Sequence, residues 1–300
     1  MLDRTAEPGR AAAPRQPLFN IPWPIAATLA VLLGIHAVRQ VLPEGWDDAL
    51  FTHLAFVPGR FTFAVAPDRV VGAVVTLAQH GADGYRQAQA ERFFLGDGSP
   101  EPWTAVSYAL LHADWGHVGL NGIWLLAFGT PVSRRFGAWR FFAFLTVGAV
   151  AGAAMQWAAQ PLDLAPVIGA SAAVSACMGA TLRFMFQPHV PLAAIVEAVG
   201  DRRRRASFQP AQPLREVLRD SRALTFLAAW FATNLLFGLY SSSLGMGGGA
   251  IAWQAHIGGF LAGLLLFPAF DPARPGDPAA GEPSLGDLAP SAPADPAADL

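Results

Sequence analysis

The chain has 300 residues, of which 53% are hydrophobic and 14% are charged, and its formal net charge is -2. A soluble domain carries about 25% charged residues, so this composition excludes an ordinary soluble protein and indicates an integral membrane protein. A net charge so close to zero does not indicate a particular partner, and we expect no nucleic-acid partner. The single cysteine, Cys177, excludes an intramolecular disulfide.

Six apolar stretches are predicted to be membrane-spanning helices, each of which needs about 20 residues. We expect residues 1–22 to form a cytoplasmic tail, residues 23–270 to form the helical core, and residues 271–300 to form a disordered cytoplasmic tail. Within the core, residues 42–102 form a large non-cytoplasmic loop, in which residues 70–78 are predicted to form a surface or interfacial helix. In chain order the predicted spans are 23–41, 117–132, 141–159, 167–186, 223–240 and 251–270.

All basic residues are arginines, and their distribution predicts the orientation of these spans. Arginines precede the first span and crowd the loops after the second and the fourth, whereas the opposite short loops, 160–166 and 241–249, contain none. The positive-inside rule therefore places both termini in the cytoplasm and the start of the second, fourth and sixth spans on the other side. The run Arg202 to Arg205 could also contact anionic lipid headgroups.

Polar residues lie near the non-cytoplasmic ends of these three spans, where an apolar environment penalises them unless they have partners or a task. His117 and Asn121 lie in the second span, Ser171 in the fourth and His256 in the sixth. With Ser171 about one turn into its helix and His256 one to two turns into its own, both lie roughly 6–9 Å below the membrane surface. Residues far apart in the sequence therefore converge on one layer.

A serine becomes a nucleophile when a neighbouring imidazole accepts its proton, so Ser171 and His256 are the candidate nucleophile and base. The spans contain no Asp or Glu, and the nearest carboxylates, Asp114 and Asp163, lie outside them. The sequence therefore favours a Ser–His dyad over a triad. The absence of an H-E-x-x-H motif argues against a metalloprotease.

The tetrahedral intermediate of such a reaction needs hydrogen-bond donors for its oxyanion. His117 and Asn121 are one helical turn apart, so both can face the site, and the backbone N–H of Ser171 is a third candidate donor. Small residues would allow the close helix packing that this site requires. The predicted facing stripes are Gly259 and Gly263 on the sixth helix, and Ser171, Ser175 and Gly179 on the fourth.

From about residue 103 to 263 the chain resembles the rhomboid family of intramembrane serine proteases. The resemblance rests on three ordered motifs, His-x-x-x-Asn at 117–121, Gly-x-Ser at 169–171, and Ala-His-x-Gly-Gly-x-x-x-Gly at 255–263, with a related run at 107–112. It implies an all-α, six-helix membrane bundle with a cavity open to the non-cytoplasmic side and no cofactor. It also implies roles for individual residues: Ser171 as nucleophile, His256 as base, His117 and Asn121 as oxyanion donors, and Gly169, Gly259, Gly263 and His112 as supporting residues.

The same resemblance implies that the substrates are transmembrane proteins, cleaved within or next to their membrane segment. In this family the fifth helix and the loop before the sixth are associated with substrate access. Here these are residues 224–240 and the glycine-rich stretch 245–249. The composition and the lack of an organelle-targeting segment suggest a bacterial inner membrane.

The chain departs from the family at three positions. Ala172 replaces the usual glycine after the serine, and its methyl group is expected to narrow the oxyanion region. Ser175 replaces an aromatic residue that packs on the histidine, so another group must hold the ring of His256. Thr104 follows Trp103 where the family commonly has Trp-Arg.

We also expect His36 and Arg39, near the end of the first span, to face lipid headgroups.

Two other classes of function remain open. One is a catalytically impaired rhomboid-like protein that binds transmembrane clients without cleaving them, for which Ala172 and Ser175 are the arguments. The other is a transporter or channel, which would be expected to carry membrane-embedded carboxylates or an inverted repeat. The sequence shows neither of these.

Overall fold

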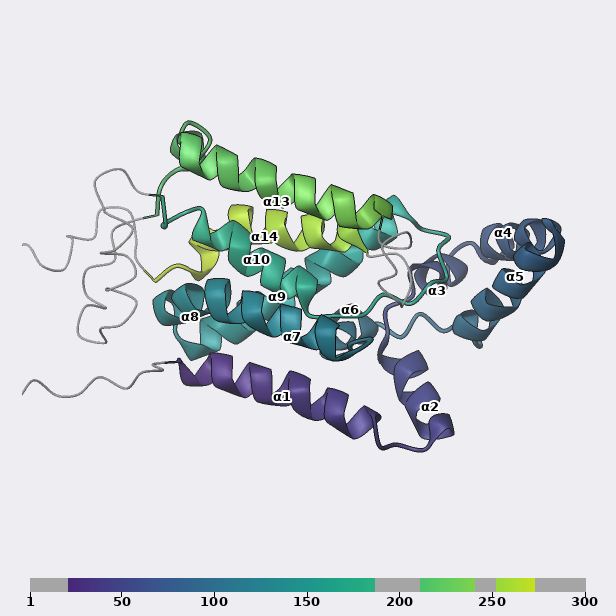
Figure 1. Cartoon of the computed structure of the whole chain (residues 1–300). Helices are drawn as coiled ribbons and strands as arrows, with labels where there is room; N and C mark the ends of the chain where they lie inside the picture. The colour runs from purple at the N-terminus through teal and green to yellow at the C-terminus, as the bar shows by residue number, and fades with distance from the viewer. Residues whose placement is uncertain (1–20, 187–210, 241–251, 273–300) are drawn as a thin grey trace, which may run out of the picture.

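The computed structural model describes residues 21–186, 211–240 and 252–272, and these are mostly helical, as predicted (Figure 1). The predicted N-terminal tail up to residue 20, the arginine run at 202–205, the glycine-rich stretch 245–249 and the tail beyond residue 272 lie outside the described residues. Within the described ranges, the only β-type pairing is an isolated antiparallel bridge between Phe56 and Val167.

Three helices form the centre of the bundle: α9 (Ala138–Ala159), α10 (Ser171–Thr181) and α14 (Trp253–Phe270). Helix α10 is enclosed by its neighbours, since every residue from 172 to 181 is buried. Its alanines, small serine and glycine allow this enclosure, because short side chains let helix backbones approach closely. The centre of the bundle is therefore packed through small residues rather than large ones.

Glycines set the separation of α10 and α14. A Cβ atom on Gly259 would lie 2.0 Å from the carbonyl oxygen of Ala172, and one on Gly263 would lie 1.9 Å from that of Ala176. The two glycines thus pack against α10 as predicted, but their partners are not Ser171 and Ser175. The residues of α10 that face these glycines are Ala172 and Ala176, one position further along the helix. Gly179 does face α14 as predicted, since a Cβ atom on it would lie 2.2 Å from the carbonyl oxygen of Phe260.

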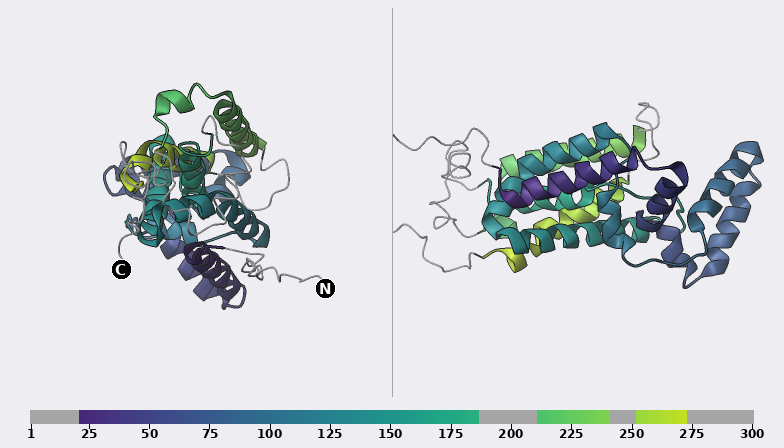
Figure 2. Two further views of the ribbon diagram at one scale, coloured as in Figure 1. Left: turned by 90° about the vertical axis from the view of Figure 1, so that its left-hand side faces the viewer. Right: turned by 90° about the horizontal axis from the view of Figure 1, so that it is seen from below.

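Two further layers flank this centre. On one side, α1 (Trp23–Arg39) packs against α7 (Trp115–Trp124) and α8 (Thr130–Phe136). A π-helical turn, η2 (Leu125–Gly129), connects α7 and α8 into one continuous helical segment. On the opposite side, α13 (Ser221–Tyr240) lies beside α14, after the short α12 (Leu214–Val217) (Figures 1 and 2). Helices α7, α10 and α14 all begin at the same end of the bundle, where α13 ends (Figure 1).

That end of the bundle carries the helices of the long segment between the first two predicted spans (Figure 1). The helix predicted at 70–78 is confirmed as part of α4, which packs on α5 through Val70, Val74 and Ala88. The chain then reaches α7 through α6 (Thr104–Ser107) and η1 (Tyr108–Leu110). In order, the segment contains α2 (Glu44–Leu54), α3 (Pro58–Phe63), α4 (Pro67–Ala78) and α5 (Gly81–Leu95).

Two of the described helices, α9 and α14, are long and apolar enough to cross a membrane, and α1 is apolar but shorter. The predicted start of the fourth span is wrong, because residues 167–170 are not helical and α10 begins only at Ser171. Ser171 is therefore the first residue of its helix, not one turn inside it. The predicted C-terminal tail starts at residue 271, and in the structure the side chain of Asp271 is buried in an ion pair with Arg135 (2.7 Å).

Candidate active site

The structure brings Ser171 and His256 together. The Oγ atom of Ser171, at the N-terminus of α10, lies 2.8 Å from Nε2 of His256, in the first turn of α14. The close packing of Gly259 on Ala172 lies less than one turn along both helices from this pair. The small residues of the two helices therefore hold the hydroxyl and the imidazole at hydrogen-bond distance, which is the geometry that an activated serine requires.

The other nitrogen of the imidazole contacts a residue that sequence reasoning missed. His256 Nδ1 lies 2.6 Å from Oδ1 of Asn234 on α13, and Asn234 Nδ2 donates to the carbonyl oxygen of Trp230 at 2.8 Å. The available signal was an amide within the apolar stretch 223–240, since a polar side chain in such a stretch needs a partner. The pattern of residues does not indicate which partner the amide of Asn234 contacts.

Neither nearby carboxylate reaches His256. Asp114 is the N-cap of α7, and its Oδ1 accepts the backbone N–H of His117 at 2.8 Å. Asp163 accepts the backbone N–H of Ala165 at 2.9 Å. Both carboxylates are thus used within their own loops, and the group that orients His256 is a neutral amide.

The ring of His117 lies beside the serine. A Cβ atom on Gly169, whose φ is 116°, would lie 2.7 Å from His117 Nε2 and 3.7 Å from Ser171 Oγ. The backbone N–H of Ala113 donates to His117 Nδ1 at 3.4 Å, so in the neutral ring the proton is on Nε2, the nitrogen that faces Gly169. This places an N–H donor beside Gly169, two residues before Ser171.

Asn121 lies one turn further along α7 and is buried. Its Nδ2 donates to the carbonyl oxygen of His117 at 2.9 Å. An amide nitrogen has two hydrogens, so one remains for another acceptor. His117 and Asn121 thus share one face of α7, as the spacing predicted.

His112 braces the chain that leads to the serine. It is fully buried, and its Nε2 accepts the backbone N–H of Ala170 at 3.3 Å. Burial, with a smaller contribution from the neighbouring His117, lowers the pKa of His112 to about 3. The ring is therefore neutral at physiological pH, as an acceptor nitrogen must be.

The end of α1 supports the same loop, so the expectation that His36 and Arg39 face headgroups is wrong. Arg39 donates to the carbonyl oxygen of His112 at 2.9 Å and forms an ion pair with Asp47. His36 is buried edge-on against Trp115, with ring centroids 4.6 Å apart. Both side chains point inward because α1 packs directly on α7.

The methyl group of Ala172 points away from the oxyanion region, contrary to expectation. It lies 2.5 Å from where a Cβ atom on Gly152 of α9 would be, so it fills the α9–α10 interface. Position 175 carries a serine instead of the aromatic residue that packs on the histidine in the family. In this structure Asn234 on α13 contacts the ring of His256 instead. Both departures from the family pattern are thus accommodated in the packing.

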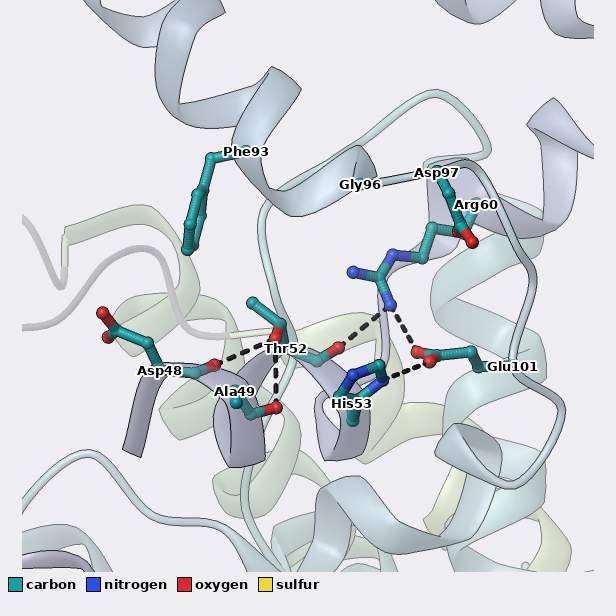
Figure 3. Close-up of a pocket in the computed structure, with 9 residues that line it drawn as sticks. All are labelled: Asp48, Ala49, Thr52, His53, Arg60, Phe93, Gly96, Asp97 and Glu101. Carbon is teal, nitrogen blue, oxygen red and sulfur yellow. Dashed lines mark hydrogen bonds and ion pairs between the residues drawn. The ribbon is translucent and has the colours of Figure 1, made fainter. Parts of the chain in front are cut away.

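A cavity of about 310 Å³ lies among α2, α3 and α5 (Figure 3), and Ser171 is not among the residues that line it. Arg60 forms a buried ion pair with Glu101 (2.5 Å), and His53 contacts the other carboxylate oxygen (Figure 3). Trp103 donates its indole N–H to the carbonyl oxygen of His53 at 2.8 Å. Arg60 from α3 thus braces the segment that contains Glu101 and Trp103. Thr104, the next residue of this segment, occupies the position where the family commonly has arginine.

A family model for the rhomboid domain matches residues 99–270. The match covers more than half of the chain, and the protein therefore belongs to the rhomboid family. This family includes serine proteases and acts on transmembrane substrates in general. Together with the apolar helices, membership indicates an integral membrane protein. No curated protein matches the chain.

Proposed function

We propose that the protein is an intramembrane serine endopeptidase that cleaves transmembrane proteins within or next to their membrane segment. The observation that carries this proposal is the distance of 2.8 Å between Ser171 Oγ and His256 Nε2. Ser171 is the nucleophile and His256 is the general base. The proposed reaction needs no metal or organic cofactor.

The arrangement supports the following sequence of steps. Ser171 Oγ attacks the scissile carbonyl carbon while His256 Nε2 takes the hydroxyl proton. The carbonyl oxygen becomes negative beside the Nε2–H of His117, the backbone N–H of Ser171 and the remaining amide hydrogen of Asn121. His256 then gives its proton to the leaving amine, and water hydrolyses the acyl-enzyme by the same steps, which restores the serine.

In the membrane we propose a six-span bundle with both termini in the cytoplasm and the site opening to the opposite side, in a bacterial inner membrane. The arginine distribution supports this orientation. The common starting end of α7, α10 and α14, next to the helices of the long loop, also supports it (Figure 1). Lipids surround the bundle and also deliver the substrate, which is itself a membrane protein.

Cleavage of a single-pass model substrate in proteoliposomes tests the proposal. Wild-type protein is expected to yield two fragments, identified by mass spectrometry, and Ser171→Ala and His256→Ala are expected to yield none. Products from Ser171→Ala would contradict it. Retained binding of the substrate by wild-type protein across a panel of such substrates, without any fragment, would instead support a client-binding protein.

A further inference from the structure

We infer that Asn234 is a positioning residue for His256, which fixes the tautomer in which the imidazole can act as a base toward Ser171. This inference rests on the proposed function and deepens it. It also makes activity depend on the docking of α13, the helix that carries Asn234.

The hydrogen bonds of Asn234 determine which way its amide faces. Its Nδ2 lies 2.8 Å from the carbonyl oxygen of Trp230, which can only accept a hydrogen bond. The nitrogen of the amide is therefore on that side, and the oxygen, Oδ1, faces His256 at 2.6 Å. Reversing the amide would place two oxygens against each other and an amide N–H against the imidazole.

The direction of the amide then determines the state of the imidazole. Oδ1 of Asn234 has no hydrogen, so the proton between the two groups belongs to His256 Nδ1. A neutral imidazole with a proton on Nδ1 has an unprotonated Nε2, which accepts the hydroxyl hydrogen of Ser171 at 2.8 Å. The other tautomer would direct an N–H at the hydroxyl and could not remove its proton.

A neutral amide provides orientation without charge. In a triad a carboxylate both orients the histidine and stabilises the imidazolium that forms during the reaction. Here Asn234 supplies the acceptor and leaves out the negative charge, which would be costly in an apolar bundle. The arrangement is thus a serine, a histidine and an amide, contributed by α10, α14 and α13.

The face of α13 that carries Asn234 is the face that contacts the bundle. Trp230, four residues before Asn234, stacks on Phe260 of α14 with ring centroids 4.1 Å apart. Phe226, four residues before Trp230, contacts Phe128, and the centroids of their rings are 5.6 Å apart. The residues around Asn234, Thr233 and Leu235, are exposed. Because Asn234 follows these two aromatic contacts along one face, it meets His256 only when α13 is docked.

The rate of fluorophosphonate inactivation of the full chain in detergent tests this role. Asn234→Ala is expected to slow inactivation by about 3- to 10-fold, the effect of losing one orienting hydrogen bond. Thr233→Ala is the matched control, because Thr233 is the adjacent residue, is exposed, and donates its hydroxyl to the carbonyl oxygen of Ala229 in its own helix. Its rate is expected to stay within about twofold of wild type. Equal rates for the two variants would overturn the inference.

The dependence of the rate on pH distinguishes positioning from a structural role. Asn234→Asp keeps the acceptor and adds a negative charge that stabilises the protonated imidazole, so the pH midpoint of inactivation is expected to rise by about one unit or more. Among the residues that the structure describes, the other titratable group whose charge acts on His256 is His117 on α7, and it is the same in both proteins. An unchanged midpoint in Asn234→Asp would overturn the inference.

The two hypotheses fail in different ways. If wild-type protein is not inactivated while an active rhomboid protease is, the proposed function fails, and this inference fails with it. If wild-type protein is inactivated at Ser171 and both Asn234 variants behave like wild type in rate and pH profile, the inference alone fails.

Discussion

At the scale of single residues, Gly169 links the backbone to the chemistry of the site. Its φ of 116° is a conformation that residues with a side chain rarely adopt, and it directs the chain into Ser171. The space that a side chain would need is also occupied, because the ring of His117 lies there. Gly169 is therefore required both for the turn and for the place of the proposed oxyanion donor.

We predict that Gly169→Ala slows fluorophosphonate labelling by at least about tenfold, because the added methyl group displaces His117. Gly137→Ala is the control: Gly137 also has a positive φ (76°), but nothing lies within 4 Å of its Cβ position. Both variants should lose about 1–2 kcal/mol of stability through backbone strain. Only Gly169→Ala should lose labelling, and equal labelling rates would contradict the account.

How much of the site could be predicted differs from residue to residue. Ser171 and His256 could be paired from the sequence, because each lies near the start of a helix that begins on the same side. Asn234 could not, because it lies near the end of its helix, and an apolar stretch does not show which face is turned inward. The direction of the Ala172 methyl group likewise depends on the rotation of α10 against α9.

At the scale of helices, the contact between α10 and α14 determines the geometry of the site. The carbonyl oxygens of Ala172 and Ala176 occupy the places where side chains at 259 and 263 would be. A helix pair this close leaves no flexible side chain that could move to accept extra atoms, so the contact tolerates only glycine. The distance between Ser171 and His256 follows from it.

Gly259→Ala is expected to separate α10 from α14, destabilise the protein by about 1–3 kcal/mol and abolish most labelling. Gly34→Ala on α1, where nothing lies within 4 Å of the Cβ position, provides the control. That change should be neutral, or stabilising by up to about 1 kcal/mol. Thermal unfolding in detergent measures both effects, and a Gly259→Ala protein as stable and reactive as Gly34→Ala would refute this view of the packing.

Hydropathy predicted most helices but could not find where α10 begins. Residues 167–170 are Val, Ile, Gly and Ala, which read as the start of an apolar helix. In the structure Val167 instead pairs with Phe56, and the conformation of Gly169 prevents helix formation before Ser171. The helices of the long loop were largely missed as well, because their mixed polarity gives no clear period.

At the scale of the whole molecule, the proposed orientation places α2 to α5 outside the cytoplasm. Cys177 is the only cysteine and is buried, so a single added cysteine can report its own position. Two exposed side chains lie at opposite ends of the bundle, and therefore on opposite sides of the membrane in the proposed topology: Asp83 on α5 and Arg215 on α12.

The protein is expressed in the inner membrane of intact bacterial cells whose outer membrane has been made permeable to the reagent. Under these conditions Asp83→Cys should react with a maleimide that cannot cross the inner membrane. Arg215→Cys should react only after the cells are lysed, because the proposed topology puts α12 in the cytoplasm. The wild-type chain, with buried Cys177, is the background control. Labelling of Arg215→Cys but not Asp83→Cys in intact cells would reverse the topology.

Fluorophosphonate labelling of the purified protein shows whether Ser171 is an activated nucleophile. We expect wild-type protein to be labelled, the label to map to Ser171 by mass spectrometry, and folded Ser171→Ala and His256→Ala to remain unlabelled. If wild-type protein is not labelled while an active rhomboid protease is labelled in parallel, Ser171 is not activated and the proposed protease function is wrong.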